Sequence, residues 1–457
     1  MKHAKVMSVV LACLMATTAL AGCSNSSSKS SSSSGAKTAT SGNVVWWGWT
    51  PGSPVNEQYI TEFNKVYPNI KVTWKQTTVA DYNAAIKPAL AAGTVDAFEV
   101  SAGSANGGIV TYASQAVDLD SAMKSALGSD YKDKVTAATI NTMTVNGKLK
   151  AIGVGSVYAG NLWINKDLFD KYNVKVPTNL AEWITACQTF KSNGITGFVQ
   201  GANGAGFDID TFHAIADNCK TNAFNDAATG KIKWTDASIV KALGLWKDMF
   251  SNGIMQSGAI GLAQYPDANN LFMAQKAAMV MMGSWYTMNT LPDTMKSNIS
   301  AAASTAAPFT MIPINFPDIA GTGKTGAMFG DLDYATAVAS ASKNIPAATT
   351  FAVWLGTSQA GQNMIANSLN LVPSLKSATP DWNSIKLVNP TAQNDVIKTY
   401  LQDSVKNGGN NPRFVNISSD FNTDMFNILT GVAGGTITPQ NAASQLAQDQ
   451  TSDNSNS

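Results

Sequence analysis

The chain has 457 residues, of which 31 are basic and 30 acidic, and only 13% of all residues are charged. This balance argues against a nucleic-acid partner, because such proteins carry a clustered positive surface. The length exceeds what a single hydrophobic core usually serves, so we expect two lobes.

The first residues predict an exported protein. Two lysines precede an apolar stretch over residues 6–21, which is too short to span a bilayer. The stretch ends in LAGC at residues 20–23, which resembles the lipobox of bacterial lipoproteins. That resemblance implies that residues 1–22 are a signal peptide and that Cys23 becomes the diacylated first residue. An ordinary secretory signal with a chance cysteine is the alternative.

Residues 23–42 are dominated by serine and contain almost no large apolar side chain. Such a segment cannot bury enough surface to fold, which is typical of a flexible tether. Two acyl chains on Cys23 are sufficient for stable attachment where one is marginal. We therefore expect a protein held by lipid on the extracytoplasmic face of the cell membrane.

Beyond the tether, strand-like and helix-like patterns alternate, which predicts an α/β fold with parallel-rich sheets flanked by helices. Strands are expected at residues 44–49, 70–74, 97–100, 162–165, 195–199, 278–282 and 334–339. Helices are expected at residues 56–66, 82–92, 166–171, 180–192, 237–252, 345–355, 420–432 and 439–446. Residues 450–457 are polar and are predicted to form a frayed tail.

Two cysteines, Cys187 and Cys219, remain once the signal and the lipid site are set aside. Outside the cytoplasm a disulfide between them is permitted, and we favour it over two buried free thiols. His213 is the only histidine after residue 22, so we expect no histidine-based metal site, no catalytic triad and no cofactor.

Five segments, in order along the chain, carry a family resemblance. They are residues 63–72 (FNKVYPNIKV), 93–98 (GTVDAF), 165–169 (NKDLF), 272–285 (FMAQKAAMVMMGSW) and 342–355 (SKNIPAATTFAVWL). Together they resemble the family 1 extracellular solute-binding proteins, the sugar-binding components of ABC importers, over residues 44–446. Val95 and Gln275 depart from the pattern, since the family commonly has proline and glycine there.

The resemblance implies two lobes that are joined by crossing strands and close on a ligand by a hinge. The N-lobe would comprise residues 43–154 and 331–376, and the C-lobe residues 155–330 and 377–449. It also implies a monomer that binds a neutral oligosaccharide, delivers it to permease subunits and is not an enzyme.

Tryptophans are the first candidates for ligand contact, because sugars present apolar C–H faces on which aromatic rings stack. Trp46 and Trp47 point to opposite faces of a strand, so one is expected in the core and Trp47 is the candidate for the groove. Trp49 lies in the turn that follows. The family resemblance implies a stacking role for Trp285. Packing within a lobe is the alternative for each.

Polar candidates follow the strands, where α/β sheets place their ligands. Carboxylates bind pairs of sugar hydroxyls, which favours Glu99 in the cleft and a structural role for Asp96. The other candidates are Tyr158, Phe207, Asp208, His213, Asp331, Asp333 and the single arginine, Arg413, whose planar fork suits a bidentate contact. Ordinary packing or solvated roles remain open for all of these.

Other functions remain as alternatives. A secreted glycosidase needs two carboxylates at a defined separation, which a sequence does not reveal. An adhesion protein usually carries repeats or an attachment tail, and the sequence has neither. Within binding proteins, a polyol phosphate or a peptide is the alternative ligand, although few cationic residues are predicted near the cleft.

Overall fold

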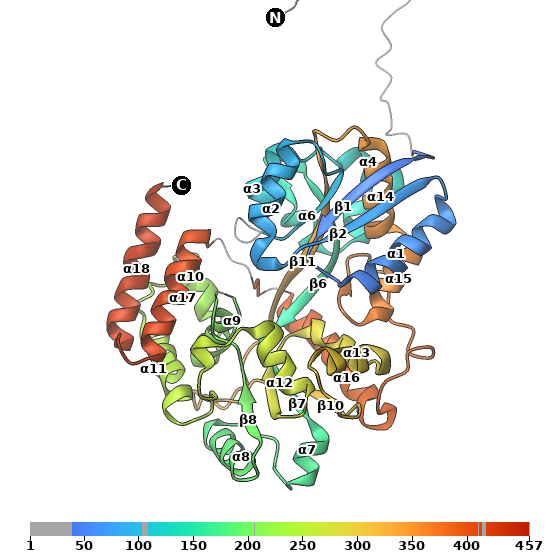
Figure 1. The fold of residues 1–457 in the computed structure, drawn as a ribbon. Coiled ribbons are helices and arrows are strands. Elements are labelled where there is room, and N and C mark those ends of the chain that lie inside the picture. Colours follow the sequence, from blue (N-terminus) through green and yellow to red (C-terminus); the bar gives the residue numbers. More distant parts are fainter. Residues whose placement is uncertain (1–38, 103–107, 205, 410, 414–416, 457) are drawn as a thin grey trace, which may run out of the picture. The chain divides into compact units, whose positions relative to one another are not determined.

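The computed structural model describes residues 39–456 except 103–107, 205, 410 and 414–416 (Figure 1). Cys23 and the signal peptide lie outside the described residues. The described strands are β1 (Gly42–Gly48), β2 (Ile70–Gln76), β3 (Ala97–Val100), β4 (Thr144–Val145), β5 (Lys148–Leu149), β6 (Ala151–Ala159), β7 (Asn161–Asn165), β8 (Thr196–Val199), β9 (Ala277–Met281), β10 (Met311–Asn315), β11 (Phe329–Val338) and β12 (Val372–Pro373).

Helices fill most of the connections between these strands. They are α1 (Ser53–Val66), α2 (Val79–Ala91), α3 (Ile109–Tyr112), α4 (Asp120–Leu127), α5 (Tyr131–Lys134), α6 (Ala137–Asn141), α7 (Lys166–Lys171), α8 (Leu180–Ser192), α9 (Phe207–Cys219), α10 (Ala223–Ala228), α11 (Ala237–Ser251), α12 (Asn269–Met273), α13 (Pro292–Ala301), α14 (Ile345–Thr357), α15 (Gln359–Ser368), α16 (Pro390–Gly408), α17 (Ser419–Ala433) and α18 (Pro439–Asn456). Short turns of other helix types are η1 (Ala113–Gln115), η2 (Ala259–Gly261), η3 (Gln264–Ala268) and η4 (Ser284–Thr290).

Within the described residues, the first large sheet has six strands in the order β12-β6-β11-β3-β1-β2. Helices α1, α14 and α15 pack together beside it, although α14 and α15 follow α1 by most of the chain (Figure 1). Asp96 joins β1 to the segment that precedes α14: its carboxylate accepts hydrogen bonds from Val45 N at 2.8 Å and from Ser342 Oγ at 2.5 Å. The predicted structural role of Asp96 is thus confirmed.

The second sheet in the described part has four strands in the order β10-β7-β9-β8, and helices cover both of its faces. The alternation of side chains along β7 explains this. Leu162 and Ile164 enter a core shared with α8, α9, α11, α17 and α18, whereas Trp163 enters a second core with residues of α12, α13 and α16. Both faces are therefore apolar, as expected for a central sheet.

Two long strands, β6 and β11, connect the sheets. They pair antiparallel along most of their length, from Phe329–Ala159 to Ala337–Ala151, with irregular register near Tyr334. Only Gly160 separates β6 from β7, the next strand of the other sheet. Both strands therefore run past the lobe limits expected at residues 154 and 331.

Three expectations are corrected. The α/β fold with helices on its sheets is confirmed, but the sheets are mixed rather than parallel-rich. Among the described strands, pairing is parallel for β1–β2, β1–β3 and β8–β9 and antiparallel for the other pairs. Cys187 and Cys219 are free thiols, so the favoured disulfide is wrong. The frayed tail is also wrong, since α18 continues to Asn456 and Gln450 accepts a hydrogen bond from Trp234 Nε1 at 2.8 Å.

No helix among the described residues combines the length and the apolar character needed to cross a bilayer.

Candidate functional site

The aromatic centre of the candidate site is Trp285, which follows β9 and Gly283. Its ring is half-buried and packs against all three hydrophobic cores of the described chain. Its Nε1 donates a hydrogen bond to Tyr265 Oη at 3.1 Å, and the Phe207 ring lies 6.1 Å away in an edge-on orientation. We call Trp285, Tyr265 and Phe207 the aromatic group.

Gly283 makes room for this ring. A Cβ on Gly283 would lie 2.1 Å from Trp285 Cζ3 and 2.3 Å from the backbone oxygen of Tyr158. The Tyr158 backbone N–H in turn donates to Ser284 Oγ at 2.9 Å. The crossing strand β6 and the start of η4 are therefore in direct contact beside Trp285.

Arg413 lies over the Trp285 ring, with its guanidinium carbon 4.8 Å from the ring centroid. Its Nε and Nη2 donate to the two carboxylate oxygens of Asp210, at 3.0 and 2.6 Å. The Arg413 and Asp210 side chains are only 10% and 8% exposed. The Arg413 guanidinium thus makes a bidentate contact, but with Asp210 in the first turn of α9.

On the six-stranded sheet, Glu99 and the turn after β1 form a second polar element. Glu99 Oε2 accepts from Trp49 N at 2.7 Å and from Thr50 N at 3.2 Å, while Oε1 is buried with no hydrogen-bond partner among the described residues. The Trp49 ring is half-buried and packs edge-on against Tyr82, with centroids 4.9 Å apart. Burial raises the pKa of Glu99 well above its usual range, which the two backbone N–H groups oppose.

The crossing strand β11 adds Asp331 and Asp333. Asp331 is buried and its Oδ1 accepts from Leu332 N at 3.0 Å. Asp333 is half-buried; burial raises its pKa to about 6, although the charge of Arg413 acts in the opposite direction. Tyr158 on β6 is buried against Gly330 and Gly408, and burial raises its pKa to about 12.

Asp208 shares the first turn of α9 with Phe207 and Asp210. Its Oδ1 accepts from Gly206 N at 3.1 Å, whereas its buried Oδ2 has no partner among the described residues. Burial raises the pKa of Asp208 to about 7, although backbone N–H groups oppose the shift.

This raised pKa predicts a pH-dependent stability. The native state keeps a proton that the unfolded chain releases near the ordinary value of 3.8, so the free energy of unfolding falls as pH rises from there to about 7. Asp208→Asn removes the ionisable group and keeps an oxygen for Gly206 N. We expect the variant to be more stable than wild type above pH 7 by roughly 1–3 kcal/mol. Urea unfolding at several pH values measures this, and a gain that does not shrink toward acidic pH would contradict it.

Two predicted residues lie away from the aromatic group. His213 is fully buried between the rings of Phe224 and Phe329, with centroids 4.3 and 3.7 Å away, so it belongs to the core near the start of β11. Trp47 is buried in the core of the six-stranded sheet, with Lys75 Nζ 3.6 Å from its ring centroid.

Tyr265 and Asp210 are part of the site but were not predicted. Tyr265 precedes a proline in η3, and nothing in the sequence marks it as a partner of Trp285. Asp210 could have been proposed from the sequence, because a single buried arginine needs an anionic partner and the first turn of α9 carries two aspartates.

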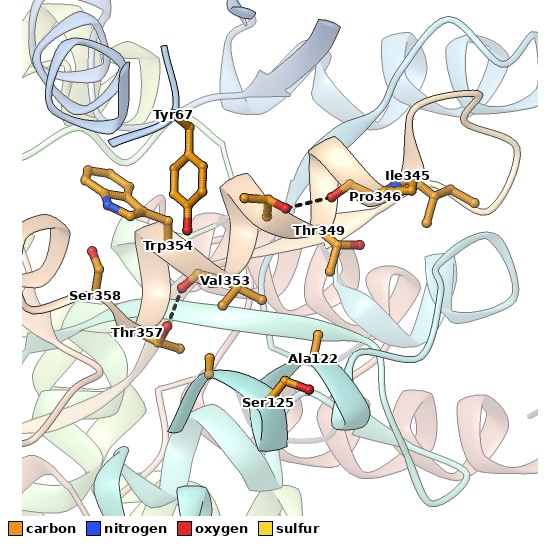
Figure 2. Close-up of a pocket in the computed structure, with 12 residues that line it drawn as sticks. Tyr67, Ala122, Ser125, Ile345, Pro346, Thr349, Val353, Trp354, Thr357 and Ser358 are labelled. Atoms are coloured by element: carbon orange, nitrogen blue, oxygen red, sulfur yellow. Dashed lines mark hydrogen bonds between the residues drawn. The ribbon is translucent and has the colours of Figure 1, made fainter. Parts of the chain in front are cut away.

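A cavity of about 460 Å³ lies apart from these residues, beside helix α14, which packs on the six-stranded sheet. Side chains of α14 and α4 line it, together with Tyr67 (Figure 2). None of the predicted site residues lines this cavity, and the described residues contain no cluster of side chains suited to a metal ion.

The chain is similar to known proteins in sequence and in fold. The family model described as bacterial extracellular solute-binding protein matches residues 47–362. No curated protein matches the chain. A structure from a study of xylan utilization by the thermophilic bacterium Caldanaerobius polysaccharolyticus is 26% identical, with a TM-score of 0.72 over 89% of this chain and 99% of that one.

Two further structures share the fold at lower identity. Maltose-bound MalE3 of T. maritima is 18% identical, with a TM-score of 0.71 over 90% of this chain and 99% of that one. A chitin oligosaccharide binding protein is also 18% identical, with a TM-score of 0.70 over 91% of this chain and 100% of that one. The two-lobed α/β fold agrees with these similarities. The family match covers more than half of the chain, and the chain therefore belongs to the bacterial extracellular solute-binding family.

Proposed function

We propose that this protein is the substrate-binding component of an ABC carbohydrate importer, and that it binds a neutral oligosaccharide and delivers it to the permease. The half-buried Trp285 in its aromatic group is the observation that carries the proposal. An indole ring held at the surface of three cores offers a flat apolar contact for the C–H face of a sugar.

The charges around the site support a neutral ligand. The neighbouring carboxyl groups are those of Glu99, Asp208, Asp210, Asp331 and Asp333, and the neighbouring cation is Arg413, which Asp210 already binds. A ligand anion would oppose the ionisation of these carboxyl groups, and burial already raises the pKa of Glu99, Asp208 and Asp333. Hydroxyl groups form hydrogen bonds with a carboxyl group in either protonation state. The solved structures of similar fold favour the same class, since they come from work on xylan utilization, chitin oligosaccharides and maltose.

The same proposal assigns the chain to two lobes. An N-lobe of residues 43–154 and 331–376 and a C-lobe of residues 155–330 and 377–449 would close on the sugar by bending of β6 and β11. Trp49 and Glu99 would meet the ligand from one side, and the aromatic group from the other.

Calorimetric titration of the purified domain with xylotriose, maltotriose and chitotriose tests the ligand class. We expect at least one of these trisaccharides to bind and to be recovered intact by chromatography after long incubation. A xylo-oligosaccharide carrying one glucuronic acid serves as the anionic control and should bind more weakly. Hydrolysis at enzyme-like turnover, abolished by a single carboxylate substitution, would instead establish the glycosidase alternative. Tight binding of a phosphorylated polyol or a peptide alone would overturn the sugar class.

We also propose that Cys23 carries a lipid that holds the protein on the extracytoplasmic face of the membrane. Cys23→Ala should move the protein from the membrane fraction to the soluble extracytoplasmic fraction, because it removes the thiol that would carry the lipid. The thermal melting temperature of the folded domain should not change. Cys13→Ala is the matched control, since that residue lies within the signal peptide. Retention of Cys23→Ala in the membrane fraction would contradict the lipobox interpretation.

A further inference from the structure

We infer that Arg413 is a positioning residue for sugar binding, which acts by fixing the Trp285 ring rather than by contacting the ligand. The inference rests on the proposed function for its ligand. The geometry itself is independent of that proposal, because it joins three separate segments: the first turn of α9, the start of η4 and the connection after α16.

The hydrogen bonds of Arg413 support a positioning role. Its Nε and Nη2 are bound by Asp210, and its guanidinium carbon lies 4.8 Å from the centroid of the Trp285 ring. A bidentate carboxylate fixes the plane of a guanidinium more strictly than a single hydrogen bond, because two parallel contacts define an orientation. The orientation of the Arg413 guanidinium is therefore set by Asp210 of α9, and the Trp285 ring lies within cation–π distance of the cation held there.

The Trp285 ring is also held along its other sides. Tyr265 Oη accepts from its Nε1, and the Phe207 ring lies edge-on. A side chain that is ordered before the ligand arrives loses little conformational freedom on binding, which favours affinity. Arg413 thus contributes to affinity through pre-ordering of the stacking surface.

Lysine would not replace this function. The chain contains 31 basic residues, and Arg413 is its single arginine. A lysine ammonium is a point charge that can approach either the carboxylate or the ring, but it has no plane with which to do both. The one arginine therefore lies where a planar cation has a specific use.

A double-mutant cycle separates positioning from direct contact. The variants are Arg413→Lys, Arg413→Met, Trp285→Ala and each double variant, titrated with the trisaccharide that binds wild type. We expect Arg413→Lys and Arg413→Met to weaken binding about 2- to 10-fold. In the Trp285→Ala background the same changes should have no further effect, because the residue through which Arg413 acts is gone. Additive losses would show that Arg413 contacts the sugar itself. Lowered melting temperature with unchanged affinity per folded molecule would reduce Arg413 to a structural role.

A second measurement needs no ligand, so failure of the inference and failure of the proposed function can be distinguished. Arg413→Met should change the tryptophan emission spectrum of the unliganded wild-type protein. The same substitution should leave the spectrum unchanged in the Trp285→Phe background. For the titrations, Lys398→Met is the matched control, because Lys398 Nζ lies 5.4 Å from the ring centroid of a different tryptophan, Trp382. It should leave sugar affinity unchanged. An Arg413 effect on emission that persists in Trp285→Phe would overturn the inference even if no trisaccharide bound.

Discussion

Replacing Trp285 with alanine is expected to weaken sugar binding about 5- to 150-fold, while each sheet keeps its own core and the fold survives. The estimate corresponds to the loss of roughly 1–3 kcal/mol of buried apolar contact when a large ring is removed. Trp285 is only half-buried, which leaves part of the ring for a ligand. Calorimetry and thermal melting on the same preparation measure both quantities.

Trp246→Ala is the matched control for this prediction. Trp246 is fully buried in α11 and donates from Nε1 to the Leu429 oxygen at 2.9 Å. Its removal should lower the free energy of unfolding by about 3–5 kcal/mol, as large core truncations do, with little effect on the affinity of the folded fraction. If Trp285→Ala behaves like Trp246→Ala, Trp285 belongs to the core and the proposed stacking contact is wrong.

The second large effect is expected for Gly283→Ala. The added methyl would lie 2.1 Å from the Trp285 ring and 2.3 Å from the Tyr158 oxygen, and the latter is backbone that cannot rotate away. The ring must move or η4 must separate from β6. We expect sugar affinity to fall at least as far as in Trp285→Ala, with a stability loss of about 1–3 kcal/mol from overpacking.

Gly244→Ala gives the comparison, because it adds the same methyl group inside α11. Apart from its chain neighbours and the backbone of its own helix, no atom of the described residues lies within 4 Å of the position that a Cβ on Gly244 would take. An alanine in a helix interior is usually more stable than glycine by about 0.5–1 kcal/mol, so this variant should be slightly stabilised and bind normally. Unchanged affinity in Gly283→Ala would show that the ring position beside Gly283 is unimportant for binding.

The fold could be predicted largely from the sequence because its elements carry strong local signals. Helix α8, for example, is capped by Asn179, whose side chain accepts from Glu182 N at 3.0 Å, and it buries Trp183, Cys187 and Phe190 on one face. Both capping and periodicity are visible in a single sequence. Strand direction is not local, so the antiparallel pairs made by β6 and β11 were not predicted.

The candidate site was less predictable for the same reason. Trp285, Phe207 and Arg413 were candidates individually, but their contact joins residues from three distant segments, which no local pattern encodes. His213 illustrates the opposite error. A lone histidine after a glycine-rich loop suggested a ligand contact, yet two flanking phenylalanine rings, Phe224 and Phe329, hold it in the core.

The order of strands in the six-stranded sheet has a consequence for biosynthesis. β11 lies between β6 and β3, but all four strands of the other sheet, from β7 to β10, precede it in the chain. A ribosome therefore completes the whole second sheet before it makes the strand that joins the two halves of the first. A product that stops before Phe329 leaves the edges of β3 and β6 without the strand that pairs with both, and such open edges promote aggregation.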